Sequence, residues 1–182
     1  MTATVSVTES QIFKVIGDFL TSILPTGVDI QQGQINRVAQ PKGPDYVIMS
    51  ELNRAIQSIN VHSYVDNGPG VQGYRNAAQE MQVSVQCDVY GPNGDVNAQA
   101  ITTLWRDMYG CEFFRAAAFP GAPMWASEPQ KAPLTNAEMQ YESRWIVDLV
   151  LQCNITVGVP MDFSTSVNVT PINVDVTFPP GA

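Results

Sequence analysis

The sequence predicts an α+β fold, with two helices packed on one face of a mixed or antiparallel sheet of four or five strands, plus extended loops and terminal arms. Three observations lead to this prediction. Two segments repeat apolar residues at helical spacing, several others alternate apolar and polar residues, and they follow in the order helix, strands, helix, strands. The chain has 182 residues, which predicts a single domain over residues 1–182 with a sizeable core.

The longest predicted strand covers residues 136–159 and is expected to be central in the sheet. Side chains alternate between the two faces of a strand, so every second residue shares a face. One face is almost wholly apolar and carries Tyr141, Ser143, Trp145, Val147, Leu149, Leu151 and Cys153. The other face mixes charged, polar and apolar residues. It is therefore expected to meet water, a helix or another subunit at different points.

The N-terminal part is predicted to hold one helix and two strands. Thr8 and Gln11 have the spacing of a capping box, so a helix is expected to begin just after Thr8. Pro25 and Gly27 end it. The expected elements in order are a loose arm over residues 1–8, a helix over 9–24, a strand over 28–32, a turn-rich loop over 37–44 and a strand from 46 to 52, with its extension toward 59 left open.

The middle of the chain is predicted to hold a strand and the second helix. Residues 60–78 contain three glycines and Pro69, which predicts either a mobile loop or the tip of a long hairpin. Residues 80–89 alternate most cleanly between apolar and polar side chains. After a turn, a helix is expected over residues 95–109, with Asp95 as its N-cap and Gly110 at its end.

The C-terminal part is predicted to be irregular on both sides of the central strand. The connector over residues 120–135 has four prolines, so it should be irregular around a short edge strand near residues 124–126. Residues 164–182 alternate again, and Pro171 favours an edge strand or an arm that pairs outside its own fold.

Charge and cysteine content exclude several classes of protein. The formal net charge is −8 and the nine basic residues are scattered, which argues against a surface that neutralises nucleic-acid phosphates. The three cysteines are far apart in the sequence and are expected to be free thiols. No stretch has the pattern of an export signal or the length of a transmembrane helix, so neither is expected.

The sequence offers little that could carry catalysis. His62 is the only histidine, and no spacing of cysteines or histidines matches a metal site. Glycine-rich nucleotide-binding motifs do not occur. We therefore expect a protein that is not an enzyme and that needs no cofactor and no metal.

A characteristic order of features runs through residues 120–163. A proline-rich loop and a polar segment lead into a long strand with an aromatic–Glu–Arg–Trp character, which is followed by a Val-Pro-x-Asp-Phe turn. The positions concerned are Tyr141, Glu142, Arg144, Trp145, Val159, Pro160, Asp162 and Phe163. Together with the strand, turn and helix over residues 83–105, this order resembles a bacteriophage neck or tail-terminator family of long-tailed phages.

The resemblance implies a structural virion protein. Such proteins form a ring, typically of six copies, which caps the tail tube, ends its polymerisation and joins the tail to the head-side neck. The implied partners are other copies of the chain, the tail tube protein and the head–tail connector or neck proteins. The implied location is the tail or neck of the virion, and the host cytoplasm during assembly. At −8 per copy, an acidic lumen would let phage DNA pass without specific binding. No membrane contact is expected.

Loops and arms are the expected contact material of such a ring, since they can order on binding. Arg144 on the central strand is expected to form a structural ion pair with Glu142 of a neighbouring strand or chain. For the aromatic candidates, packing in the core or at an edge is an equal alternative. The candidates are Tyr74 and Arg75 in the 66–76 loop, Phe119 and Trp125 in the 119–133 connector, Arg144, and Val174, Val176 and Phe178 in the C-terminal arm.

Other functions stay open at the level of sequence. Another neck or head–tail completion protein is the nearest alternative. A β-rich carbohydrate- or protein-binding module is a second, in which Trp125 would stack on a sugar. An enzyme that pairs His62 with one of the cysteines is a third.

Overall fold

The computed structural model of the chain describes residues 2–34, 41–135, 139, 141–164, 166, 169 and 170. Three helices and ten strands occur within these residues. Their bounds are β1 Thr4–Val5, α1 Glu9–Ile23, β2 Asp29–Gln32, β3 Tyr46–Ile56, β4 Val61–Val65, β5 Gly73–Tyr90, α2 Gly94–Trp105, α3 Met108–Ala116, β6 Gly121–Ala126, β7 Gln130–Lys131, β8 Leu134–Thr135, β9 Tyr141–Glu142 and β10 Arg144–Met161.

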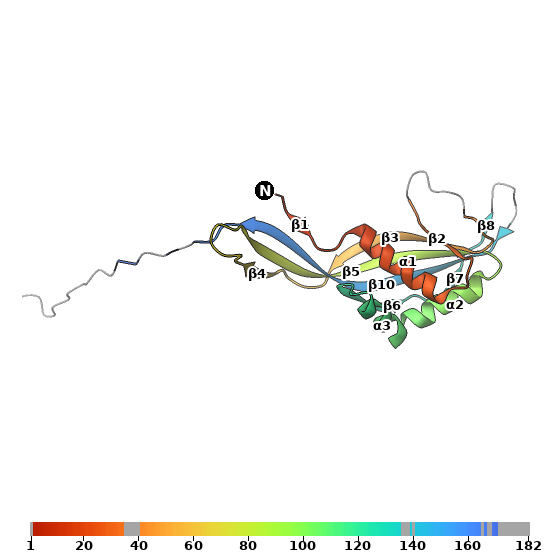
Figure 1. Ribbon diagram of the computed structural model, residues 1–182. Helices are drawn as coiled ribbons and strands as arrows, with labels where there is room; N and C mark the ends of the chain where they lie inside the picture. The colour runs from red at the N-terminus through yellow and green to blue at the C-terminus, as the bar shows by residue number, and fades with distance from the viewer. Residues whose placement is uncertain are drawn as a thin grey trace, which may run out of the picture.

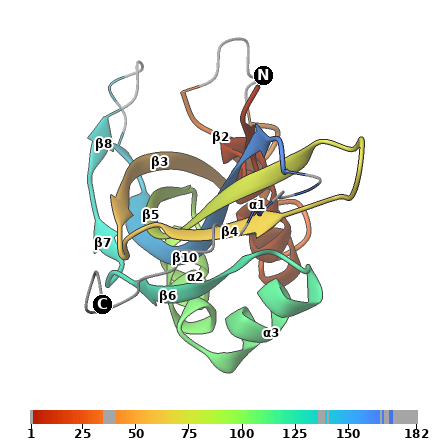
Figure 2. The same ribbon diagram turned by 90° about the vertical axis from the view of Figure 1, so that its left-hand side faces the viewer.

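The strands form one large curled sheet and one small pair (Figure 2). Strands β5 and β10 pair antiparallel along their whole length, from Arg144 opposite Tyr90 to Met161 opposite Gly73. Strands β3 and β4 flank β5, while β1, β6 and β7 flank β10. Strand β2 pairs with β3 in parallel, so the sheet is mixed. The predicted α+β fold with a mixed sheet is confirmed, and so is the central position of β10.

The predicted number of strands was too small. The described part of the chain contributes eight strands to the large sheet instead of four or five. Three of them, β1, β4 and β7, have five residues or fewer, attach to one side of β5 or β10 and were not predicted, whereas β6 is the short edge strand expected near residues 124–126. Such short edge strands lack the long alternating pattern that reveals a strand in a sequence. Strand β1 lies within the segment that was expected to be a loose arm.

The second predicted helix proved to be two helices. Helix α2 ends at Trp105, and a new helix α3 begins at Met108. The side chain of Asp107 accepts a hydrogen bond from the backbone N–H of Tyr109 and caps α3. Gly110 therefore lies inside α3 instead of ending α2. A Cβ at this position would lie 3.0 Å from the carbonyl oxygen of Leu104, so its absence lets α3 approach the end of α2 closely.

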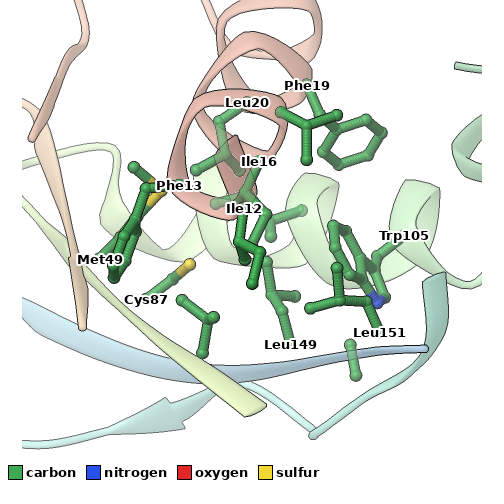
Figure 3. Packing of buried hydrophobic residues seen from close by; sticks show 14 of the residues in the cluster. Ile12, Phe13, Ile16, Phe19, Leu20, Met49, Cys87, Trp105, Leu149 and Leu151 are labelled. Atoms are coloured by element: carbon green, nitrogen blue, oxygen red, sulfur yellow. The ribbon is translucent and has the colours of Figure 1, made fainter. Parts of the chain in front are cut away.

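All three helices contribute to one apolar core on the same face of the sheet (Figure 3). Helix α1 begins with the predicted capping box between Thr8 and Gln11. The buried side of β10 is the predicted apolar face, and the Trp105 indole N–H donates to the carbonyl oxygen of Val150 at 3.2 Å. Fully buried core residues on helices and strands include Ile12, Ile16, Phe19, Leu20, Trp105, Phe114, Val147, Leu149, Leu151 and Cys153.

The helices cover only part of the length of β5 and β10 (Figure 1). Beyond the helices, the two strands continue together with β4 and β1 as a narrow projection at the end of the molecule opposite β8. Residues 60–78 therefore belong to a long hairpin, one of the two predicted possibilities. We call β1, β4, the tip loop over residues 66–72, residues 73–78 of β5 and residues 156–161 of β10 the arm, and the remainder the body.

Two helix glycines allow the close approach of α3 to be tested. Gly110→Ala should lower the free energy of unfolding by about 1 kcal/mol, since the new methyl group would press on the α2 backbone. Gly17→Ala in α1 is the matched control. Its methyl group would make an ordinary 3.5 Å contact with Met49 Cε, so greater helix propensity should raise the unfolding free energy by about 0.5–1 kcal/mol. Urea unfolding of both variants measures the difference. Equal stabilisation by both would contradict the close approach.

Candidate interaction surfaces

Exposed apolar side chains gather on the arm, along both of its edges. Strand β4 is exposed along its whole length, with Val61 at 63% and Tyr64 at 59% of their full accessibility. Val5 on the opposite edge is 53% exposed. Isolated exposed apolar residues are normal, but a contiguous group marks a site of protein contact. Other exposed apolar residues on or beside the arm are Ile56, Ile59, Val65, Val71 and Met161.

The arm also carries few charges. Between residues 56 and 79 the charged side chains are Asp66 and Arg75, which cancel, and His62 is the chain's only histidine. Residues 149–161 contain no charged side chain. A chain with a net charge of −8 therefore has a nearly neutral projection. Low charge and exposed apolar surface together fit a contact surface better than a solvated one.

Hydrogen bonds and side-chain packing hold the tip of the arm in a defined conformation. The Asp66 side chain accepts a hydrogen bond from the Gly68 N–H at 2.9 Å, and the Asn67 side chain donates to the Gln72 carbonyl oxygen at 2.7 Å. The ring of Phe163 lies against Gly73, where a Cβ would clash with both the ring and the carbonyl oxygen of Val65. Residue 73 must therefore be glycine for the chain after β10 to pack on the tip.

The face of the sheet that points away from the helices carries a buried polar cluster on β5 and β10. Arg144 donates to Asp88 with an N–O distance of 3.0 Å, and Gln86 donates to the same carboxylate oxygen at 2.8 Å. The Asp88 residue is 8% exposed. Arg144 also lies 5.8 Å from the ring centre of Tyr90, in the geometry of a cation–π contact.

Asp148 belongs to this cluster, but its carboxylate is incompletely hydrogen-bonded. Its backbone N–H donates to the Ser127 hydroxyl at 2.8 Å. One carboxylate oxygen, Oδ1, is buried without a hydrogen-bond partner. Burial, and secondarily the charge of Asp88, raise the pKa of the Asp148 carboxyl above its ordinary value. Ionised Asp148 therefore costs folding free energy, and the cost grows as the pH rises.

The predicted interface residues fall into three groups. Tyr74 and Arg75 lie on the arm, within strand β5, so the expected loop over residues 66–76 ends at Gly73. Tyr74 is half-buried and Arg75 exposed. Trp125 is 47% exposed on β6, opposite Val150. These three residues are available for contacts.

Two other predicted residues make contacts within the fold. The partly buried Phe119 ring packs edge-on against Phe114, with ring centres 5.8 Å apart, at the edge of the core. Within the chain, Arg144 has Asp88 as its ion-pair partner, because the two residues are far apart in sequence but lie on paired strands. The expected pair with Glu142 of a neighbouring copy stays a prediction. Val174, Val176 and Phe178 lie outside the described residues.

Sequence analysis missed β4, the most exposed strand of the arm. A usable signal was present, since Val61, Tyr64 and Val65 are β-formers and the run is bounded by Asn60 and by the turn sequence after Val65. The glycines that follow this run instead led to the prediction of a mobile loop or a hairpin tip. The buried cluster around Asp88 left no comparable signal, because no local spacing connects residues 88 and 144.

Groups with catalytic potential do not converge in the described part of the chain. His62 is exposed on β4, whereas Cys87 and Cys153 are buried in the core. Burial raises the pKa of the Cys153 thiol to about 11 and that of Cys87 further, so both thiols are poor nucleophiles. Among the described residues, no three histidine, cysteine or acidic side chains could together hold a metal ion. No helix there is long and apolar enough to span a membrane.

The exposed apolar side chains of the arm are typical of a surface that contacts other proteins. A family model described as phage neck terminator protein matches residues 10–181, nearly the whole chain. The chain belongs to this family and has a structural role in the tail or neck of the virion. A search of curated proteins gave no match.

Phe119 and Trp125 can be separated by their effect on stability. Phe119→Ala should lower the free energy of unfolding by about 2 kcal/mol, because it removes a ring packed on the core. Trp125→Ala should change it by less than about 1 kcal/mol, because that side chain is half exposed. Urea unfolding monitored by circular dichroism measures both. A larger loss at Trp125 would show that its ring carries part of the fold.

The Asp148 site predicts a stability that depends on pH. For an acid whose pKa is raised by folding, stability falls as the pH rises from the unfolded value of 3.8 through the folded pKa. Asp148→Asn removes this titration, so it should stabilise the protein by on the order of 1 kcal/mol at neutral pH. The gain should shrink toward pH 4. Thermal unfolding across this range, with exposed Asp162→Asn as control, tests the pH dependence. A gain independent of pH would show that the charge is not the cause.

Proposed function

We propose that the protein forms a ring, of six copies, that caps the tail tube, ends its polymerisation and joins the tail to the head-side neck. The observation that carries this proposal is the uncovered arm of a chain that belongs to the neck terminator family. The helices cover only part of β5 and β10, and apolar side chains of the arm are exposed in a single copy. Contacts between copies, or with the tube, would bury it.

The proposed partners are other copies of the chain, the tail tube protein and the connector or neck proteins, in the assembled virion and in the host cytoplasm beforehand. We propose that phage DNA crosses the ring without specific binding. Among the described residues, Lys14, Arg54, Arg106 and Arg144 form ion pairs within the chain, and the excess of acidic residues disfavours binding to phosphates. The proposed role is structural, without catalysis.

Two exposed valines give a matched test of the ring. Val61 on the arm and Val96 on α2 are 63% and 65% exposed, so aspartate at either position should leave the fold intact. Val61→Asp should weaken ring formation and capping at least tenfold, because a charge would have to be buried in the contact. Val96→Asp should assemble like the wild type.

Light scattering and electron microscopy of the protein, alone and added to growing tubes of tail tube protein, would measure assembly. Annular particles at tube ends, with tubes that stop growing, are the expected result. Wild-type protein that neither forms rings nor binds tube ends would overturn the proposed function. Equal loss of assembly in both variants would remove the arm from the contact.

A further inference from the structure

We infer that neighbouring copies join by pairing the free edge of β4 in one copy with the free edge of β1 in the next. This inference rests on the proposed ring and names the contact that closes it. In the described structure, β4 pairs only with β5 and β1 pairs only with β10. The arm is therefore a four-stranded ribbon, in the order β4, β5, β10, β1, with an unpaired strand at each side.

The edge of β4 lacks the protection found at other edges. An exposed edge strand is a template for pairing with another chain, and proteins usually block it with proline, charge, a bulge or a covering element. Strand β6 contains Pro123 and shifts register opposite Val150 and Leu151. Helix α1 contacts β2, and Glu9 accepts a hydrogen bond from Gln32. Strand β4, with five exposed residues, has none of these devices.

The two free edges lie at the same level of the ribbon. Val5 is opposite Val157, which is opposite Ala77, which is opposite His62. In the next row, Thr4 and Ser63 occupy the two ends. Thr4 is held there because Gly158 has no side chain: a Cβ would lie 2.9 Å from the Thr4 hydroxyl oxygen. Ser6 fixes the same strand through hydrogen bonds with the Thr156 backbone.

Strand direction also matches. Each neighbouring pair in the ribbon is antiparallel, so β4 and β1 run in opposite directions. A second copy related by rotation about an axis along the ribbon places its β1 antiparallel to β4 of the first. Antiparallel pairing is the more stable arrangement, and repeated use of two different edges closes a ring.

Charge favours this contact over contacts through the body. Copies of a chain with net charge −8 repel one another. Within the arm, Asp66 lies in the tip loop and Arg75 on β5, so neither belongs to the edge strands. The two edges can meet without burying a like-charged pair.

Engineered cysteines test the pairing directly. In a Cys111→Ser background, which removes the half-buried thiol, Thr4→Cys and Ser63→Cys place one reactive thiol on each edge. Treatment of assembled rings with a short bismaleimide should give a ladder of covalent multimers up to the full ring. The same protein carrying only one of the two cysteines should give monomers.

The outcomes separate this inference from the proposed function. Rings or capped tubes that give no ladder with the double variant overturn the β4–β1 contact and leave the ring standing. Covalent dimers from Ser63→Cys alone overturn it in favour of a two-fold contact between β4 edges. Lack of any ring or capping overturns the proposed function first. As a second readout, Ser63→Lys should weaken assembly at least tenfold, whereas Gln99→Lys on α2 should not.

Discussion

The antiparallel pairing of β5 with β10 is the interaction on which the rest of the structure depends. Both strands have 18 residues, and every residue of one has a partner in the other. Both strands are flanked by shorter strands, so their position in the sheet is internal along most of their length. The register of this pair sets which side chains face the helices, because a shift by one residue would exchange the two faces.

The same pair creates two different environments along its length. Over the body, the helices bury alternate residues such as Val85 and Leu149. Over the arm, the strands continue without helices, and their register now aligns β4 and β1 at two edges. One continuous pair of strands thus connects the core to the surface proposed for assembly. No helix packs on the described residues of the arm, so the continuation of its two long strands into the body contributes to its stability.

Periodic patterns predicted the parts of the fold that are locally regular. The apolar face of β10 and the capping box of α1 were found because the determinants lie within a few residues of each other. The α2–α3 break was missed because Gly110 also fits a helix end. Its actual role, close contact with Leu104 and Trp105, depends on tertiary packing.

The candidate surfaces were predicted less well, for a related reason. Arg75 and Trp125 are exposed and Tyr74 is half-buried, and all three were chosen because they lie in glycine- or proline-rich segments. The sequence did not reveal the free edge of β4. An unprotected edge can be recognised only after the pairing of the other strands is known. The Asp88–Arg144 pair likewise depends on strand register, which no spacing in the sequence encodes.

The distribution of charge determines how easily the proposed ring can close. The arm is nearly neutral, while the body carries most of the net charge of −8. Contact between arms gains apolar burial and edge hydrogen bonds, but it brings acidic bodies together. At physiological salt, charges interact over about 8 Å, so only closely placed bodies repel strongly. A tube end that holds several arms in place would offset part of this repulsion and the entropy of association. Ring closure on the tube, in preference to closure in solution, follows from the proposed contact.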